Sequence, residues 1–135
     1  MKIVLCLDTQ NGMLFNHRRQ SQDAGMRRHL LKMVGDHRLL MNAYSAKIFK
    51  TDSIMVDEDF LSVAGDDDFC FVENIALDTS NPNIDTLIVY RWNRLYPSDT
   101  VLDIDIAWEI RENFDIRGTS HNPITVQILK RNKKA

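Results

Sequence analysis

Nearly continuous apolar runs alternate with amphipathic segments through the first part of the chain. The apolar runs are residues 2–7, 37–41, 53–56 and 68–74. Such runs are typical of strands that are buried on both faces of a parallel sheet. Helices are predicted between them, over residues 21–34, 43–49 and 57–65. Strands that alternate with short helices predict a doubly wound, mostly parallel sheet.

The segment Ser21–Val34 shows the clearest helical pattern. Its apolar residues at positions 26, 30, 33 and 34 follow the i, i+4, i+7, i+8 spacing of one helix face. We expect Ser21 to be the N-cap and Asp23 to lie in the first turn. Gly35 is expected to end the helix, because glycine readily adopts the backbone conformation of a helix stop.

The pattern changes after residue 84. Residues 87–92, 108–118 and 124–132 are strand-like, and the turn-rich segment "GTSHNP" joins the last two. Within residues 108–116, apolar and charged residues alternate, as in an antiparallel strand with one face in water. The predicted fold class is therefore α/β, with a mostly parallel central sheet, flanking helices and an antiparallel C-terminal hairpin. A chain of 135 residues is expected to form a single domain, residues 1–135.

Charged residues are distributed unevenly, although the net charge is only −2. Residues 17–50 contain eight Lys or Arg and two acids, whereas residues 51–90 contain ten acids and no Lys or Arg. We expect a basic and an acidic face if these segments stay apart in space. The basic segment could bind a phosphate or another anion, or it could be the solvated side of one helix. The candidate anion-binding residues are Arg18, Arg19, Arg27, Arg28 and Lys32.

Several classes of function find no support in the sequence. No apolar run approaches the roughly 18 residues of a membrane-spanning helix, so no membrane partner is expected. The two cysteines lack CxxC spacing and the four histidines lack ligand spacing, so no metal site is expected. A cytoplasmic location is the default expectation for a chain of this kind.

Four stretches carry a resemblance to a known family. They are "DTQNGML" after the first strand, "HRLLMNAYSAKIF", "LIVYRWNRLYPSDTVLDID", and a closing hairpin with Trp108 in one strand and "HNPITVQILKR" as the other. In order and content these stretches resemble dihydrofolate reductase. Ser98-Asp99-Thr100 takes the place of the family's Gly-Asp-Thr. The resemblance covers nearly the whole chain and implies the fold of that family.

The resemblance also implies a pterin site. The family binds the pterin ring with a carboxylate on its first helix, which assists protonation. Asp23 is the candidate for that catalytic role, and alternatively it is a first-turn acid that favours the helix dipole. The implied ligand-binding residues are Leu5, Asp8, Asn11, Gly12 and Tyr90, of which Tyr90 falls where the family has a threonine.

The resemblance implies that the cofactor-binding residues of this chain differ from those of the family. The family holds the NADPH pyrophosphate on a Gly-Gly pair after its fifth strand, and Glu73-Asn74 stands there in this chain. A carboxylate about 4 Å from a phosphate adds a repulsion of ~1–4 kcal/mol. Asn42 and Ser45 replace the Gly and Thr of the family's Met-Gly-Arg/Lys-x-Thr motif. Asn42, Ser45 and Asn74 are therefore the cofactor-binding candidates, and NADPH in its usual pose is not expected.

Three functions are compatible with these observations. The first is a small-ligand-binding or regulatory protein on a dihydrofolate-reductase-like fold, without ordinary reductase activity and with a pterin-like or nucleotide ligand. The second is an active NAD(P)H-dependent reductase that holds its cofactor in an altered pose. The third is a nucleic-acid-binding protein that uses the basic residues of 17–38, for which binding should weaken steeply with salt.

Overall fold

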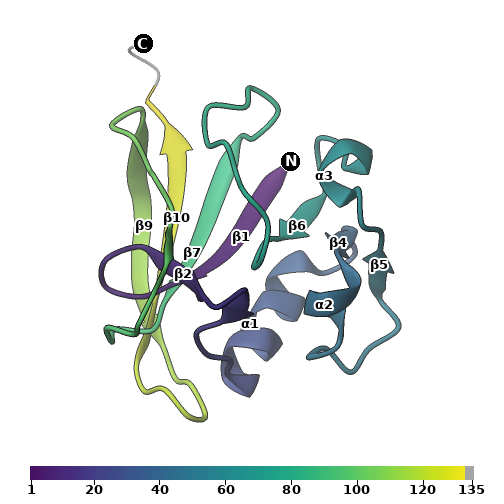
Figure 1. Cartoon of the computed structure of the whole chain (residues 1–135). Coiled ribbons are helices and arrows are strands. Elements are labelled where there is room, and N and C mark those ends of the chain that lie inside the picture. Colours follow the sequence, from purple (N-terminus) through teal and green to yellow (C-terminus); the bar gives the residue numbers. More distant parts are fainter. Residues whose placement is uncertain (133–135) are drawn as a thin grey trace.

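The computed structural model describes residues 1–132, which form a large sheet, a small sheet and three helices (Figure 1). The strands are β1 (Lys2–Leu7), β2 (Gly12–Phe15), β3 (Arg18–Arg19), β4 (Leu39–Met41), β5 (Ile54–Val56), β6 (Phe69–Phe71), β7 (Thr86–Arg91), β8 (Thr100–Val101), β9 (Trp108–Ile116) and β10 (Ile124–Arg131). The helices are α1 (Ala24–Val34), α2 (Ala43–Ala46) and α3 (Phe60–Val63). Within residues 1–132, no helix is long and apolar enough to cross a bilayer.

The large sheet has the strand order β5-β4-β6-β1-β7-β10-β9. Neighbouring strands from β5 to β7 are parallel, and β10 runs antiparallel to both β7 and β9. In Figure 1 the sheet extends from β9 on the left to β5 on the right, with the helices toward the β4 and β5 side. The small sheet has the order β3-β2-β8. The arrangement confirms the predicted fold class.

The central strand β1 is covered on both faces. Successive side chains of a strand point to opposite faces, and here Val4 and Leu5 belong to two different apolar clusters. Helix α1 packs in the Val4 cluster with its buried residues Met26, Leu30 and Val34. Each such side chain contributes about 1.5–3 kcal/mol when it is fully buried. Burial of this apolar stripe is therefore the main interaction that holds α1 on the sheet.

Several helix ends differ from the predictions, and the helix predicted over residues 57–65 is the shorter α3, which ends at Val63 with Ala64 rather than Gly65 as its C-cap. The N-cap of α1 is Asp23, not Ser21, and its Oδ1 accepts a hydrogen bond from Met26 N at 3.0 Å. Gly35 ends the helix as predicted. Its φ is 56°, which residues other than glycine rarely adopt. Helix α2 ends at Ala46 rather than at residue 49. The N–H groups that follow bond three residues back and tighten the chain into turns.

Strand β9 does not show the predicted alternation of buried and exposed residues. Trp108 is buried, but Ile110 is 52% exposed and Phe114 is 37% exposed. The strand is the last of the sheet and pairs with β10 alone. A register shift opposite Ile128 and Leu129 also interrupts this pairing. An edge strand with such an irregularity bends and twists away, so its apolar residues do not all remain against the core.

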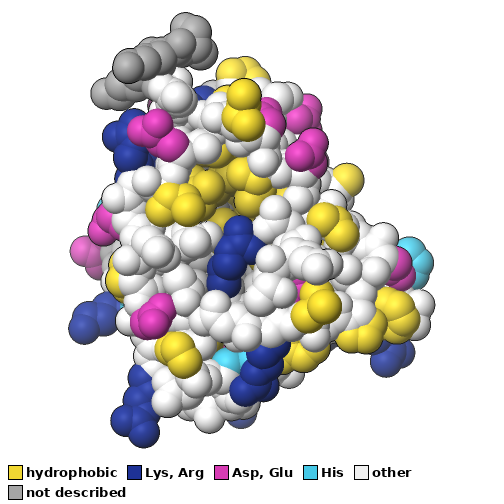
Figure 2. Space-filling model, turned by 90° about the vertical axis from the view of Figure 1, so that its left-hand side faces the viewer, with side chains coloured by type: hydrophobic (Ala, Val, Ile, Leu, Met, Phe, Trp, Pro, Cys, Tyr) yellow, Lys and Arg dark blue, Asp and Glu magenta, His cyan; other side chains and the backbone are white. Residues whose placement is uncertain are grey.

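The basic and acidic segments of the sequence meet in the fold. The guanidinium of Arg19 forms an ion pair with Glu73, and that of Arg38 forms one with Asp68. On the face shown in Figure 2, Lys and Arg side chains are spread out, with acidic side chains among them and a hydrophobic hollow in the upper part. The predicted separation into a basic and an acidic face is thus only partial.

Candidate functional site

The carboxyl ends of the parallel strands gather polar side chains at one edge of the sheet. Asp8 follows β1, Glu73 and Asn74 follow β6, and Asn42 follows β4. Open α/β sheets bind ligands in the crevice beyond these ends. This edge is therefore the candidate functional site, and we call it the carboxyl edge.

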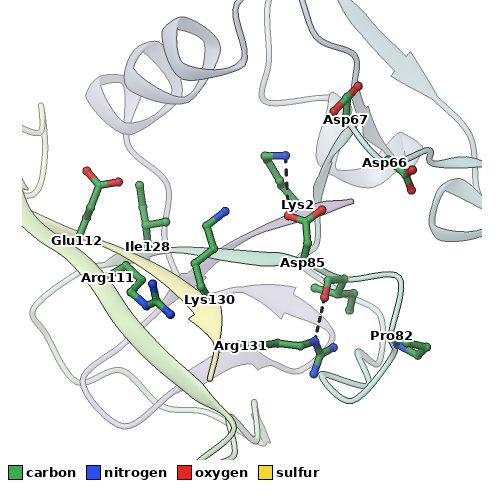
Figure 3. A pocket seen from close by; sticks show the side chains of 11 residues that line it. Lys2, Asp66, Asp67, Pro82, Asp85, Arg111, Glu112, Ile128, Lys130 and Arg131 are labelled. Atoms are coloured by element: carbon green, nitrogen blue, oxygen red, sulfur yellow. Dashed lines mark hydrogen bonds and ion pairs between the residues drawn. The ribbon is translucent and has the colours of Figure 1, made fainter. Parts of the chain in front are cut away.

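A second large pocket lies at the opposite end of the strands (Figure 3). It has a volume of about 810 Å³ and is lined by Lys2, Asp66, Asp67, Pro82, Ile84, Asp85, Arg111, Glu112, Ile128, Lys130 and Arg131. Its charges are balanced and largely engaged. Lys2 Nζ lies 3.8 Å from Asp85, and Arg131 Nε donates to the Ile84 carbonyl at 3.2 Å. Its four basic side chains are already engaged, by Asp85, Glu109, Thr86 and the Ile84 carbonyl, so size alone does not make this pocket the functional site.

A bidentate ion pair closes the carboxyl edge. Arg19 Nε lies 2.9 Å from Glu73 Oε2, and Arg19 Nη2 lies 3.1 Å from Oε1. The guanidinium also stacks on the Tyr44 ring, 4.3 Å from its centroid, and donates to the Tyr44 carbonyl at 3.3 Å. The Glu73 side chain is 5% exposed and that of Arg19 is 19% exposed. Burial opposes the charge of Arg19, but hydrogen bonds and attraction from Glu73 outweigh it and raise the pKa of Arg19.

Empty space lies on two sides of the Arg19 side chain. One is an internal cavity of about 10 Å³, lined by Cys6, Met13, Arg19, Gln20, Ser21, Glu73 and Trp92. The other is an open groove of about 500 Å³, lined by Phe15, Asn16, Arg18, Arg19, Gln20, Tyr96 and Pro97. We call these the inner cavity and the outer groove. Arg19 and Gln20 belong to both linings, so they form the wall between them.

The strands β2 and β3 present Arg19 to this site as a short hairpin. Asn16 and His17 form its tip, both with positive φ, which gives the twist that tight hairpins favour. Asp99 accepts a hydrogen bond from Asn16 N at 2.9 Å and donates its own N–H to the Leu14 carbonyl. The Ser98-Asp99-Thr100 stretch thus holds the hairpin in place.

Asp8 is a buried acceptor at the base of the hairpin. Its carboxylate accepts the N–H groups of Gln10, Gly12 and Tyr96 and the side-chain amide of Gln20, at 2.8–3.3 Å. Burial raises the pKa of Asp8, but these hydrogen bonds outweigh burial and lower it. A Cβ on Gly12 would lie 2.5 Å from Asp8 Oδ2, so the close approach requires glycine. These contacts show a structural role, and ligand binding by Asp8 and Gly12 stays a prediction.

Two other predicted ligand-binding residues have different surroundings. Leu5 is completely buried in the core. Asn11 has a φ of 62°, and its Oδ1 accepts a hydrogen bond from Arg91 Nη1 at 2.7 Å. The ligand-binding role of both residues stays a prediction.

Tyr90 is completely buried, and its hydroxyl lies 2.7 Å from His29 Nδ1. Burial raises the pKa of Tyr90. Burial also lowers the pKa of His29, and the positive charge of Lys32 lowers it further.

We expect Tyr90→Phe to lower the free energy of unfolding by about 1 kcal/mol, because it removes one internal hydrogen bond at nearly constant shape. Urea unfolding measures this, and an equally stable variant would show that the bond contributes nothing. Binding of a ligand by Tyr90 stays a prediction.

Asp23 has contacts that suit a structural role. Beyond the cap bond to Met26, its carboxylate accepts the backbone N–H groups of Thr119, Ser120 and His121 at 2.8–3.1 Å. Burial disfavours its charge, but these donors outweigh burial and hold the pKa of Asp23 well below its ordinary value. A carboxyl group with so low a pKa is a poor proton donor near neutral pH. The catalytic role of Asp23 therefore stays a prediction that these contacts do not favour.

The imidazole of His121 links Asp23 to the inner cavity. Nδ1 lies 3.4 Å from Asp23 Oδ2, and Nε2 lies 2.9 Å from Ser21 Oγ and 2.8 Å from Tyr96 Oη. The ring is buried and its centroid is 4.5 Å from that of Trp92. Sequence reasoning missed this cluster, because its members are scattered along the chain and form no motif.

The five candidate anion-binding residues do not share one surface. Arg19 is engaged by Glu73, and Arg18 lines the outer groove. Arg27 and Arg28 line a separate groove of about 310 Å³ with Ala24, Leu31, Ile48, Phe49 and Lys50. Lys32 lies in the last turn of α1. Binding of a phosphate or a nucleic acid by this set stays a prediction.

Comparisons with known proteins bear on the fold. No protein-family model matches the sequence, and no curated protein matches it. Among solved structures, a dihydrofolate reductase from Enterococcus faecalis, complexed with NADP(H) and RAB-propyl, matches with a TM-score of 0.69. The match covers 98% of this chain and 96% of that one. The chain has the dihydrofolate reductase fold. The two sequences are 12% identical, so the likeness shows the fold alone.

On this dihydrofolate reductase fold, the cofactor-binding candidates lie partly together. Asn42 caps α2 by accepting a hydrogen bond from Ser45 N at 3.1 Å, and its Nδ2 donates to Asn74 Oδ1 at 2.7 Å. Ser45 Oγ is buried and has no hydrogen-bond partner within residues 1–132. The two asparagines therefore satisfy each other, and binding of a cofactor by these three residues stays a prediction.

Proposed function

We propose that this chain binds a small molecule at the carboxyl edge of its sheet and does not catalyse ordinary NADPH-dependent reduction of dihydrofolate. The observation that carries the proposal is the Arg19–Glu73 pair, which fills the crevice at the end of β6 with the protein's own side chains. Arg19 lies on the two-residue strand β3, and the proposal requires this short hairpin to move and open the pair. The edge is therefore a site that a ligand can enter when the hairpin moves.

The residues at this edge do not fit NADPH in its usual pose. Where the resemblance places a Gly-Gly pair against the pyrophosphate, a buried carboxylate is present at Glu73. If the hairpin opens and Arg19 leaves, that carboxylate repels a phosphate, by about 1–4 kcal/mol at ~4 Å. If Arg19 stays, its side chain occupies the space. Either state opposes an anionic cofactor next to Glu73.

The outer groove has the character of a small-ligand site. Phe15 and Tyr96 provide aromatic surface, and Asn16, Arg18 and Gln20 provide polar groups. Sites for small molecules usually combine apolar walls with a few placed polar groups. A pterin-like ligand or a nucleotide base is compatible with this lining, as is any planar molecule of similar size.

We expect NADPH to leave the melting temperature of the protein unchanged up to millimolar concentration. A ligand at 100 times its Kd adds about 2.7 kcal/mol of stability, which in a domain of this size raises Tm by several degrees. Thermal unfolding with NADPH, NADH or buffer alone measures this directly. A saturable rise at micromolar NADPH would overturn the proposal. It would favour the alternative of an active reductase, to be tested next by NADPH oxidation with dihydrofolate.

A further inference from the structure

We infer that Glu73 is the recognition group of a binding site for a guanidinium or amidinium group, and that Arg19 occupies this site as an internal stand-in. The inference rests on the proposed function and names the chemistry of its ligand. It comes from the contacts of the Arg19 side chain, because a bound guanidinium or amidinium group would make the same contacts.

The contacts of Arg19 select a flat cation with two parallel donors. Glu73 accepts two hydrogen bonds, from Nε at 2.9 Å and from Nη2 at 3.1 Å. The Tyr44 ring covers one face of the guanidinium at 4.3 Å, and the Tyr44 carbonyl accepts a further bond at 3.3 Å. A paired carboxylate, an aromatic face and a carbonyl acceptor together match a guanidinium or an amidinium. An ammonium group has no plane to stack and no fork of donors.

A buried acceptor beside the ion pair is still unused. Gln20 lines both the inner cavity and the outer groove. Its Nε2 donates to Asp8 Oδ2 at 3.0 Å, while its buried Oε1 accepts no hydrogen bond from residues 1–132. Buried polar atoms without partners are uncommon in native proteins. A ligand with an additional N–H group can use this oxygen, which the single side chain of Arg19 leaves unpaired.

The position of Arg19 gives an external ligand a way in. Its side chain separates the inner cavity from the outer groove, so its removal joins the two spaces and exposes Glu73 to the groove. The aromatic residues Phe15 and Tyr96 line the outer side and can contact the body of a ligand whose cationic group reaches Glu73. A tethered group competes as if it were present at about millimolar concentration. The wild-type protein should therefore bind such ligands much more weakly than a variant that lacks Arg19.

Benzamidine and benzylamine form a matched pair of probes for this site. Each consists of a phenyl ring with one positively charged group, but only the amidinium of benzamidine has the flat fork of donors. We expect Arg19→Ala to bind benzamidine saturably, at least roughly tenfold more tightly than wild type, and to bind benzylamine much more weakly. The double variant Arg19→Ala/Glu73→Gln should lose benzamidine binding. Isothermal calorimetry and thermal unfolding provide both readouts.

Three outcomes overturn the inference. They are no benzamidine binding by folded Arg19→Ala, equal binding of the two probes, and benzamidine binding that persists without the Glu73 carboxylate. If Arg19→Ala does not fold, Arg19→Gln takes its place, because glutamine removes the competing positive charge while its amide can still donate one hydrogen bond to Glu73. Absence of benzamidine binding by that variant is equally decisive. NADPH binding by wild type overturns the proposed function whatever the benzamidine result, so the two failures are distinguishable.

Discussion

Replacing Asp23 with alanine should lower the free energy of unfolding by about 3–5 kcal/mol, since a buried charge network loses its centre. The carboxylate caps α1 and also accepts the N–H groups of Thr119, Ser120 and His121. Without it these donors lose their acceptor, and each unsatisfied buried group costs about 1–3 kcal/mol. Urea unfolding should show a lower midpoint at unchanged slope. The exposed neighbour Gln22 provides the control, since Gln22→Ala should change stability by less than ~0.5 kcal/mol.

Asp23→Asn separates the charge of this residue from its shape. The pKa of Asp23 is lowered in the folded state, so its contribution is complete above the unfolded value of about 3.9 and is lost as pH falls through the folded value. The asparagine variant lacks that contribution at every pH. The difference in stability between wild type and variant should therefore narrow as the pH falls below about 4. A difference that stays constant with pH would contradict the role that we assign to the charge.

Breaking the Arg19–Glu73 pair from one side should also be costly. Arg19→Met leaves the Glu73 carboxylate buried without a partner, and losses of about 3–5 kcal/mol are typical of such changes. In the double variant Arg19→Met/Glu73→Leu, both charges are absent and their desolvation cost disappears. We expect it to be close to wild type in stability, with a large coupling between the two substitutions in a double-mutant cycle. Urea unfolding of the four proteins measures that coupling.

Arg18→Met is the matched control for this cycle. Arg18 is the neighbouring residue in β3, but its side chain is exposed. The substitution should change stability by less than ~0.5 kcal/mol. Additive effects of Arg19→Met and Glu73→Leu would show that the pair contributes no coupling energy, and would remove the physical basis for a closed carboxyl edge.

The main strands of the large sheet could be predicted because each depends on a local pattern. The apolar run of residues 2–7 is β1 over its full length. The run that contains Phe69–Phe71 is the strand β6 beside it, and the run that contains Leu39–Met41 is β4, the next strand in the sheet. The turn-rich "GTSHNP" does join the two antiparallel strands β9 and β10. Hydrophobic period and turn residues are properties of neighbouring positions, so a single sequence contains them.

The site could not be predicted to the same extent, because it depends on pairs that are distant in the sequence. Arg19 and Glu73 are 54 positions apart, and Ser21 and His121 are 100 apart. From the sequence alone, Glu73 stood out only as an obstacle to a phosphate, and Arg19 was one of several basic residues. Complementary charges in two segments were the available indication, but many pairings satisfy it. The packing of the β2–β3 hairpin and of the loop before β10 against the ends of the parallel strands decides which residues meet at the carboxyl edge.

The contacts of Asp23 also have a consequence for the order of folding. The N-cap residue of the first helix, Asp23, accepts hydrogen bonds from the N–H groups of residues 119–121, which lie 96–98 positions further along the chain. Contacts of such sequence separation require a large loop to close first, and they are typical of slow-folding topologies. During synthesis, α1 emerges before residues 119–121, so the Asp23 carboxylate at its N-terminus is still exposed and lacks their N–H groups. It reaches its final stability only when the last hairpin of the sheet has formed and docked.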